Sequence, residues 1–363
     1  MKNRKCYFFF FFFFIFIILF TNFYIKDILL FEAKLRNFIK NGKFTIRDIN
    51  KDGIPISFSP KIGKYISPFY VVNYGIYYSE ILREKNIITP QNPNLCWKED
   101  ESLKYWYFPI NKDKVTLRYF KNTADWIVNN LQMINGKAHL IYRFNWPYPK
   151  YRYKFIKAPW WSGLTDGYAI ILLIRAYDIF KEPKYLITAT KLYKSVIYPV
   201  DKGGSLTKLN NFLWIEEYVD PLHPLETPKV LNGMIYSFYG VKCYEEKFNV
   251  PINLQFSEKL VQSIEKNIKV FDKGFWSYYD AIKNTANIKY HLIHVALLKD
   301  LADNYQLKLT KTYNNWGIGA KFPILWIFYS DFSIAKLHFF IDVILIFIII
   351  FGLLKFIICK RLL

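Results

Sequence analysis

Apolar side chains recur with a helical spacing through the middle of the chain. Between residues 122 and 134 they return every three or four positions, for example at Ala124, Ile127 and Leu131, as on the buried face of an amphipathic helix. The same spacing recurs in the segments 162–179, 184–197, 230–248, 254–271 and 286–305. Short connections alternate with longer loops, so the pattern predicts a mainly α fold, an (α/α) barrel or toroid whose longer loops carry the site.

A very apolar run near the amino end follows a short basic segment. Lys2, Arg4 and Lys5 precede residues 7–20, which carry no charge and include seven consecutive phenylalanines. A basic flank before an apolar run is typical of a signal peptide or signal anchor, and no cleavage site of small residues follows it. We therefore expect an uncleaved transmembrane anchor over residues 1–26.

A second apolar run lies near the carboxyl end. Residues 339–358 are long enough to cross a bilayer and are interrupted only by Asp342 and Lys355. A buried core helix is the alternative, but the near absence of charge favours a transmembrane helix. Lys360 and Arg361 follow this run, so the positive-inside rule predicts both termini in the cytosol and the domain between them outside the membrane.

A turn-rich, aromatic region separates the first apolar run from the helical segments. Turn residues at 50–53 and 59–60 lie between short apolar runs at 43–46 and 70–72, which predicts short strands and loops. The chain then divides into a transmembrane anchor (1–26), a membrane-proximal region with short strands and loops (27–114), an (α/α)-barrel domain (115–310), a connector (311–336) and a transmembrane helix with a basic tail (337–363).

The charge balance of the chain is strongly basic. Lys and Arg number 50 against 29 Asp and Glu, a formal net charge of +21, and the part between the two apolar runs remains basic. Such a surface attracts polyanions, whether nucleic acid, anionic lipid or an acidic polysaccharide. Composition alone does not choose among these three partners.

Four cysteines do not form a disulfide framework. Cys6 and Cys359 flank the two apolar runs, so that only Cys96 and Cys243 could meet within the domain. A disulfide between them and a free buried thiol at Cys243 are both consistent with the sequence. Since no paired CxxC or HExxH element occurs, we predict no metal site.

Carboxylates and phenols gather where helices are expected to begin. Glu216, Glu217 and Tyr218 precede the helix expected at 230–248, and Asn232-Gly233 stands at its start. The pairs Tyr279-Asp280 and Tyr290-His291 lie around the start of the helix expected at 286–305, with His294 close behind. These residues supply acids and bases without the spacing of a metal site.

Several motifs occur in an order that resembles a known enzyme family. They are Trp160-Trp161-Ser162-Gly163, 173–177, Gly203-Gly204, 214–218, 230–237, Tyr279-Asp280 and 290–294. Together they resemble the carboxy-terminal catalytic domain of D-glucuronyl C5-epimerases, which convert D-glucuronate to L-iduronate within heparan-type polysaccharides. The resemblance spans roughly residues 115–306 and implies an (α/α) barrel, no cofactor, and an acidic polysaccharide rather than nucleic acid as partner. It leaves a homodimer open.

The resemblance assigns roles to four residues. Removal of the C5 proton, which lies α to a carboxylate, needs a base on one face of the sugar, a proton donor on the other and positive or hydrogen-bonding groups around the carboxylate. Glu217 and Tyr290 are implied as the pair that exchanges protons with C5. Tyr218 and Tyr279 would orient the carboxylate or pass protons.

Beside these four residues we expect a set of substrate-binding residues: Trp161, Arg175, Glu216, Asn232, Asp280, Lys283, Lys289, His291 and His294. The arginine that the family places two residues after the Tyr-Asp pair is Ile282 here, so Arg175, Lys283 or Lys289 would have to replace its charge. Each residue has a plainer interpretation as well. Glu216 could form a structural salt bridge, Asn232-Gly233 could serve close packing, and the tryptophan and histidines could belong to the core.

Three other functions compete with a membrane-tethered epimerase. A polysaccharide lyase begins with the same C5 proton abstraction and then expels the C4 substituent. An inverting glycoside hydrolase would use two carboxylates, such as Glu217 and Asp280. A glycan-binding or assembly protein of the membrane could keep the fold without catalysis.

Overall fold

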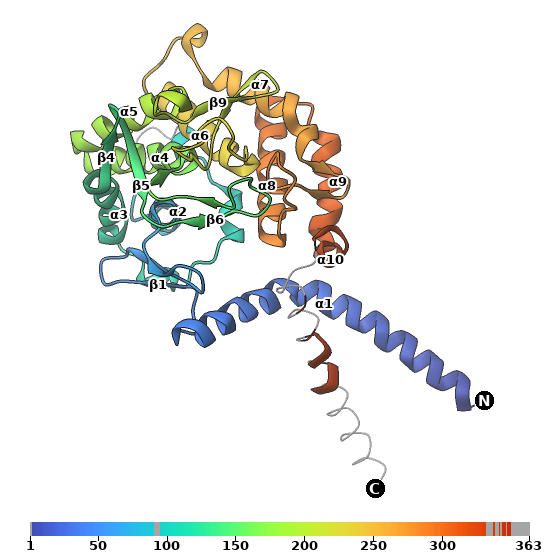
Figure 1. Ribbon diagram of the computed structural model, residues 1–363. Coiled ribbons are helices and arrows are strands. Elements are labelled where there is room, and N and C mark those ends of the chain that lie inside the picture. The colour runs from blue at the N-terminus through green and yellow to red at the C-terminus, as the bar shows by residue number, and fades with distance from the viewer. Residues whose placement is uncertain are drawn as a thin grey trace.

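The computed structural model describes residues 2–90 and 95–331, and beyond these residues 337, 341, 343–345 and 347–349; for residues 2–14, 17 and 18 it describes the backbone only. The described chain is mainly helical, with short antiparallel strands in its loops (Figure 1).

The α-helices are α1 (Lys2–Asn41), α2 (Pro68–Glu84), α3 (Leu117–Asn130), α4 (Gly163–Phe180), α5 (Pro183–Val196), α6 (Leu231–Lys247), α7 (Ser257–Asn267), α8 (Ile288–Tyr305), α9 (Thr310–Lys321) and α10 (Trp326–Tyr329). The short 3₁₀ helices η1 (Leu95–Trp97) and η2 (Glu101–Tyr105) follow α2.

The strands form small antiparallel sheets between the helices. One sheet has the order β1 (Arg47–Ile49), β2 (Pro55–Ser59), β3 (Gly63–Tyr65), and another β4 (Leu131–Ile134), β5 (Lys137–Tyr142), β8 (Trp160–Trp161). The two-stranded pairs are β6 (Trp146–Pro147) with β7 (Phe155–Ile156), β9 (Leu206–Leu209) with β10 (Phe212–Ile215), and β11 (Asp272–Lys273) with β12 (Trp276–Ser277).

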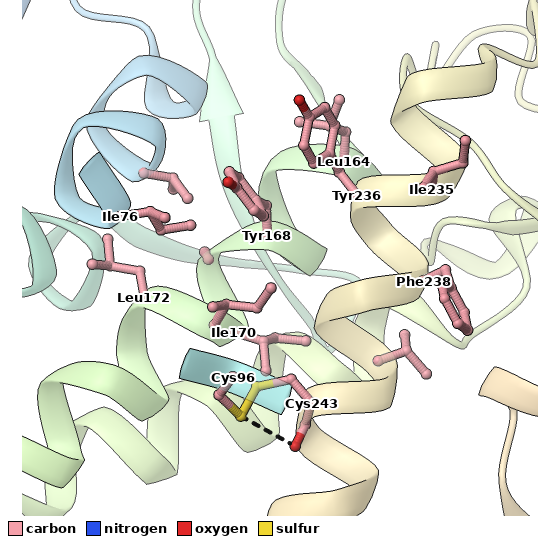
Figure 2. Packing of buried hydrophobic residues seen from close by; sticks show 14 of the residues in the cluster. Ile76, Cys96, Leu164, Tyr168, Ile170, Leu172, Ile235, Tyr236, Phe238 and Cys243 are labelled. Carbon is pink, nitrogen blue, oxygen red and sulfur yellow. Dashed lines mark hydrogen bonds between the residues drawn. A yellow bond between two sulfur atoms is a disulfide. The ribbon is translucent and has the colours of Figure 1, made fainter. Parts of the chain in front are cut away.

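Helix α4 is the centre of the core. Ser162 caps its start by accepting a hydrogen bond from the Thr165 amide, and its residues are buried from Gly163 to Ala176. A helix that is apolar on all sides must be enclosed by other elements, and α2, α5 and α6 pack around it. Figure 2 shows side chains of α4 meeting those of α6 in this core.

The close approach of α4 and α6 depends on glycine. A Cβ atom on Gly240 would overlap the carbonyl of Gly167, and a Cβ atom on Gly167 would meet the backbone of Ser237. Glycine removes this obstacle, so the two helix backbones come nearly into contact. The contact between α4 and α6 therefore depends on two glycines, because there is no room for a larger side chain at either position.

A disulfide ties η1 to α6. Cys96 and Cys243 are bonded, with their Cα atoms 5.0 Å apart (Figure 2). The bond spans a sequence separation of 147 residues, and a cross-link over so long a loop restricts the unfolded chain strongly. Of the two alternatives that the sequence left open, the disulfide is the one present.

Most helices lie where the apolar spacing predicts them. The segments expected at 162–179, 184–197, 230–248 and 286–305 match α4, α5, α6 and α8 within a few residues. Residues 70–72, expected as a short strand, instead lie inside α2, which starts with a proline after Ser67, a common helix beginning. Residues 131–134, expected to continue a helix, form β4.

The predicted transmembrane helices are wrong. Among the residues that the structure describes, none of the helices combines the length and apolar character that crossing a bilayer requires. The second half of α1 carries charged residues such as Lys26 and Glu32, and it buries Ile25 and Ile28 against the domain near Trp326. Most of the residues predicted as the second span, 337–363, lie outside the described residues.

Two further predictions depended on the transmembrane helices and are wrong as well. The predicted localisation, an external domain with both termini in the cytosol, rested entirely on them. The predicted fold class, an (α/α) barrel between two membrane helices, is replaced by a mainly helical fold with small sheets, packed around α4.

Substitution of Gly240 tests the contact between α4 and α6. Because its new Cβ would press on the Gly167 backbone, Gly240→Ala should lower the free energy of unfolding by about 1–3 kcal/mol. Gly317 on α9 has open space around it, so the matched Gly317→Ala should leave stability unchanged or raise it by up to about 1 kcal/mol. Urea unfolding followed by circular dichroism measures both. Equal stability of the two variants would contradict the close-packing account.

Candidate active site

Three of the predicted acids and phenols, Glu217, Tyr218 and Tyr290, line a small cavity, the inner pocket, with a volume of about 70 Å³. Its lining comes from the end of β3 and the start of α2, from the residue that follows η2, from the β5–β8 region, from the loop after β10 and from the first turns of α4, α6 and α8. The residues are Tyr65, Ser67, Phe69, Tyr70, Trp106, Tyr142, Phe144, Trp146, Trp160, Ser162, Leu164, Thr165, Glu217, Tyr218, Asn232 and Tyr290.

Glu217 enters the pocket because of its place after strand β10. In an extended chain successive side chains point to opposite sides, so Glu216 and Glu217 face different surroundings. Glu217 lies against the start of α6, where a Cβ atom on Gly233 would overlap its side chain. Gly233 thus provides the space for this carboxylate.

The Glu217 carboxylate is buried and held by two donors. It is 7% exposed, its Oε1 accepts a hydrogen bond from the Tyr279 hydroxyl at 3.0 Å, and its Oε2 accepts one from Asn232 Nδ2 at 3.4 Å. Burial raises the pKa of Glu217 to about 8, even though hydrogen bonds from Tyr218 and Tyr279 lower it. A carboxyl group with this pKa can exchange a proton near neutral pH.

The three tyrosines beside Glu217 remain protonated. The hydroxyls of Tyr218 and Tyr279 are 3.2 Å apart, and the rings of Tyr279 and Tyr290 are 4.8 Å apart between centroids. Burial raises the pKa of each phenol well above 10, and the charge of Glu217 raises it further. They can therefore serve as proton donors and hydrogen-bond donors rather than as resident phenolates.

His291 and His294 lie behind the pocket rather than in its lining. His294 Nε2 is 3.3 Å from Asn232 Oδ1, and the Nδ1 atoms of both histidines are 2.9 Å from Ser277 Oγ. Burial lowers the pKa of both histidines to about 3, so both are neutral. His294 holds Asn232, which in turn holds Glu217, and Ser277 links His291 to His294. Neither histidine lines the inner pocket.

Glu216 and Asp280 bind neighbouring loops and do not line the inner pocket. Thr227 donates to Glu216 Oε2 at 2.5 Å, and the Lys229 ammonium lies 3.8 Å from the same oxygen. Asp280 accepts hydrogen bonds from Tyr148 at 2.7 Å and from the amide and side chain of Asn284. Both carboxylates are fully buried and fasten loops around the pocket instead of facing it.

Three other predicted substrate residues lie away from the inner pocket. Arg175 is buried in α4, where it pairs with Glu80 at 2.7 Å and binds backbone carbonyls near η1. Lys283 is exposed and donates to the Val270 carbonyl. Trp161 stacks on His139 and donates to the Gly204 carbonyl at 3.1 Å, whereas its neighbour Trp160 lines the pocket.

The region before residue 114 supplies pocket residues that the sequence did not reveal. Tyr70 and Trp106 line the inner pocket, and their rings are 6.2 Å apart. Trp106 also lies 6.0 Å from Tyr290, centroid to centroid. The helix start at Ser67-Pro68 is the signal that could have placed Tyr70 on the first turn of a helix facing the site.

Comparisons with known proteins identify the family to which this chain belongs. The family model described as D-glucuronyl C5-epimerase C-terminus matches residues 135–317. The D-glucuronyl C5-epimerase of Caenorhabditis elegans is 29% identical over 236 residues, which cover 56% of this chain and 36% of the worm protein. An uncharacterized protein of Methanocaldococcus jannaschii is 25% identical over 280 residues, which cover 72% of this chain and 81% of that protein. The chain therefore belongs to the family defined by the C-terminal part of D-glucuronyl C5-epimerases.

Proposed function

We propose that this chain is a uronyl C5-epimerase that acts on uronate units within an anionic polysaccharide, with D-glucuronate and L-iduronate as the two epimers. The observation that carries the proposal is Glu217, a buried carboxyl with a pKa raised to about 8, in the same pocket as the protonated phenol of Tyr290. A base and an acid of this kind are what inversion at a carbon next to a carboxylate requires.

The reaction needs one proton to leave C5 and another to arrive on the opposite face. Ionised Glu217 takes the C5 proton, and the electron pair of the broken C–H bond is delocalised onto the uronate carboxylate. Tyr290 then gives its phenolic proton to the other face of C5, which inverts the carbon. Glu217 is left protonated and Tyr290 ionised, the state from which the reverse reaction starts.

The surrounding groups support this proton exchange. Tyr279 and Asn232 fix the Glu217 carboxylate by hydrogen bonds to separate oxygens, so the base is already oriented when substrate arrives. Orientation before the chemical step lowers the barrier because less ordering remains to be done. The raised pKa of Glu217 places it close to working pH, where a general base is most effective.

The direct test is incubation of the protein with a glucuronate polysaccharide in deuterated water. An epimerase brings deuterium to C5 and forms L-iduronate without shortening the polymer. Absorbance from an unsaturated uronate would instead identify a lyase, and new reducing ends without exchange would identify a hydrolase. Absence of exchange together with tight polysaccharide binding would identify a non-catalytic binding protein.

Substitution of the two proposed proton carriers should abolish exchange. Glu217→Gln and Tyr290→Phe each remove the exchangeable proton with little change of shape, and each should lower the exchange rate by about 100-fold or more. Tyr177→Phe is the matched control: Tyr177 lies near the C-terminal end of α4, away from the inner pocket, and this variant should retain the normal rate. Deuterium content at C5 measured by mass spectrometry reports all three. A Glu217→Gln variant with the normal rate would eliminate Glu217 as the base.

The pH dependence of exchange should follow the ionisation of Glu217. Because only the ionised carboxylate takes the proton and its pKa is about 8, kcat/KM should rise about tenfold per pH unit below pH 8 and level off above it. Initial exchange rates between pH 6 and 9.5 measure this profile. A profile that is already level at pH 6 would mean that Glu217 ionises near the ordinary value for a carboxyl group, against the proposal.

A further inference from the structure

A second, larger cavity lies beside the inner pocket, and we call it the outer groove. It has a volume of about 460 Å³ and lies between α1 and the elements η2 and α8. Its lining includes the cations Lys26, Arg36, Arg47, Lys104 and Lys289 and the carboxylates Asp27 and Glu32. Tyr70 and Trp106 line both cavities, so the outer groove and the inner pocket meet at these two rings.

The two cavities differ in size, and the difference suggests which part of a polymer each one binds. Pockets for small molecules usually have volumes of about 300–1,000 Å³, so the inner pocket at about 70 Å³ admits little more than the reacting part of a sugar. The outer groove at about 460 Å³ has the room for neighbouring units. Its excess of cations suits a chain of negative charge.

Arg47 lies where the two cavities meet, and one of its hydrogen-bond donors, Nε, has no partner. Its guanidinium is stacked on the Tyr70 ring, 3.4 Å from the centroid, and its Nη1 donates to the Tyr107 carbonyl at 2.9 Å. The residue is only 5% exposed, and its Nε is buried without a hydrogen-bond partner. It forms no salt bridge with any residue that the structure describes. A buried cation in this condition gains from any anion that can reach it.

Lys289 supplies a second cation at the same junction. Its ammonium lies 4.2 Å from the ring centroids of both Trp106 and Tyr290, which puts a positive charge beside the proposed proton donor. Within the described parts of the chain it has no carboxylate partner closer than 4.0 Å. Burial lowers the pKa of Lys289, and the charge of Arg47 lowers it further.

The charges of Arg47 and Lys289 also lower the pKa of Tyr70. Burial by itself would raise its pKa, but Arg47 and Lys289 together bring the pKa of this phenol below 10. Two cations close enough to act on one phenol repel each other until an anion comes between them. The two cations at this junction therefore favour the binding of a negative group that reaches the outer groove.

We propose that Arg47 and Lys289 together bind the carboxylate of the uronate whose C5 is attacked, while neighbouring sugars of the polymer lie in the outer groove. This inference rests on the proposed function. As the C5 proton leaves, negative charge grows on a carboxylate that is already an anion, and two fixed cations stabilise that charge.

The test is calorimetric binding of two polymers, a glucuronate polysaccharide and the same polysaccharide with its carboxyl groups reduced to hydroxymethyl groups. Arg47→Met and Lys289→Met each remove a cation while keeping an apolar side chain of similar length. Each should weaken binding of the acidic polymer by about tenfold or more, the range of a charge-assisted hydrogen bond. Binding of the reduced polymer should stay the same. Lys299→Met, an exposed position on the same helix α8, is the matched control.

The outcomes separate this inference from the proposed function. Equal losses for both polymers, or no loss, would overturn the role of Arg47 and Lys289, even if the wild type exchanges C5 deuterium normally. A loss confined to the acidic polymer, in a wild type that shows no exchange, would keep the carboxylate site and refute the epimerase. If Arg47→Met fails to fold, Arg47→Gln and Lys289→Met carry the same comparison.

Discussion

The site depends on one physical constraint, the burial of the Glu217 carboxyl against the start of α6. Gly233 makes room for it, and Asn232 and Tyr279 bind its two oxygens. Burial raises its pKa to about 8. The rest of the pocket is arranged around that carboxyl: neutral phenols on one side, neutral histidines behind Asn232, and the cations of Arg47 and Lys289 at the entrance.

Structural and chemical roles are divided between neighbouring residues of the same motif. Glu216 fastens the loop before α6 while Glu217 faces the pocket, because adjacent side chains of an extended chain point apart. Trp161 packs on His139 in the core while Trp160 lines the pocket. Tyr279 donates a hydrogen bond to Glu217, while Asp280 accepts one from the Asn284 amide in the loop that follows. A short motif can thus build the wall of a site and supply its reactive group.

Helical periodicity was enough to predict α4, α5, α6 and α8, since each buries a continuous apolar face or core. The motifs also pointed to Glu217 and Tyr290, which the structure places in the lining of the same pocket. Arg47, Tyr70 and Trp106 could not be found in this way, because distant segments bring them together and no local pattern marks that meeting. The transmembrane prediction rested on apolar runs in the sequence alone, and none of the helices among the described residues is long and apolar enough to cross a bilayer.

The ionisation of Glu217 in the folded protein is the quantity on which the account depends most directly. Carbon-13 NMR of protein labelled at the glutamate side-chain carboxyl, with Glu217→Gln used to assign the signal, would follow it alone. The account predicts a titration midpoint near pH 8. A midpoint near 4.5, the ordinary value for a glutamate, would show that this carboxyl is not poised for proton exchange and would contradict the account.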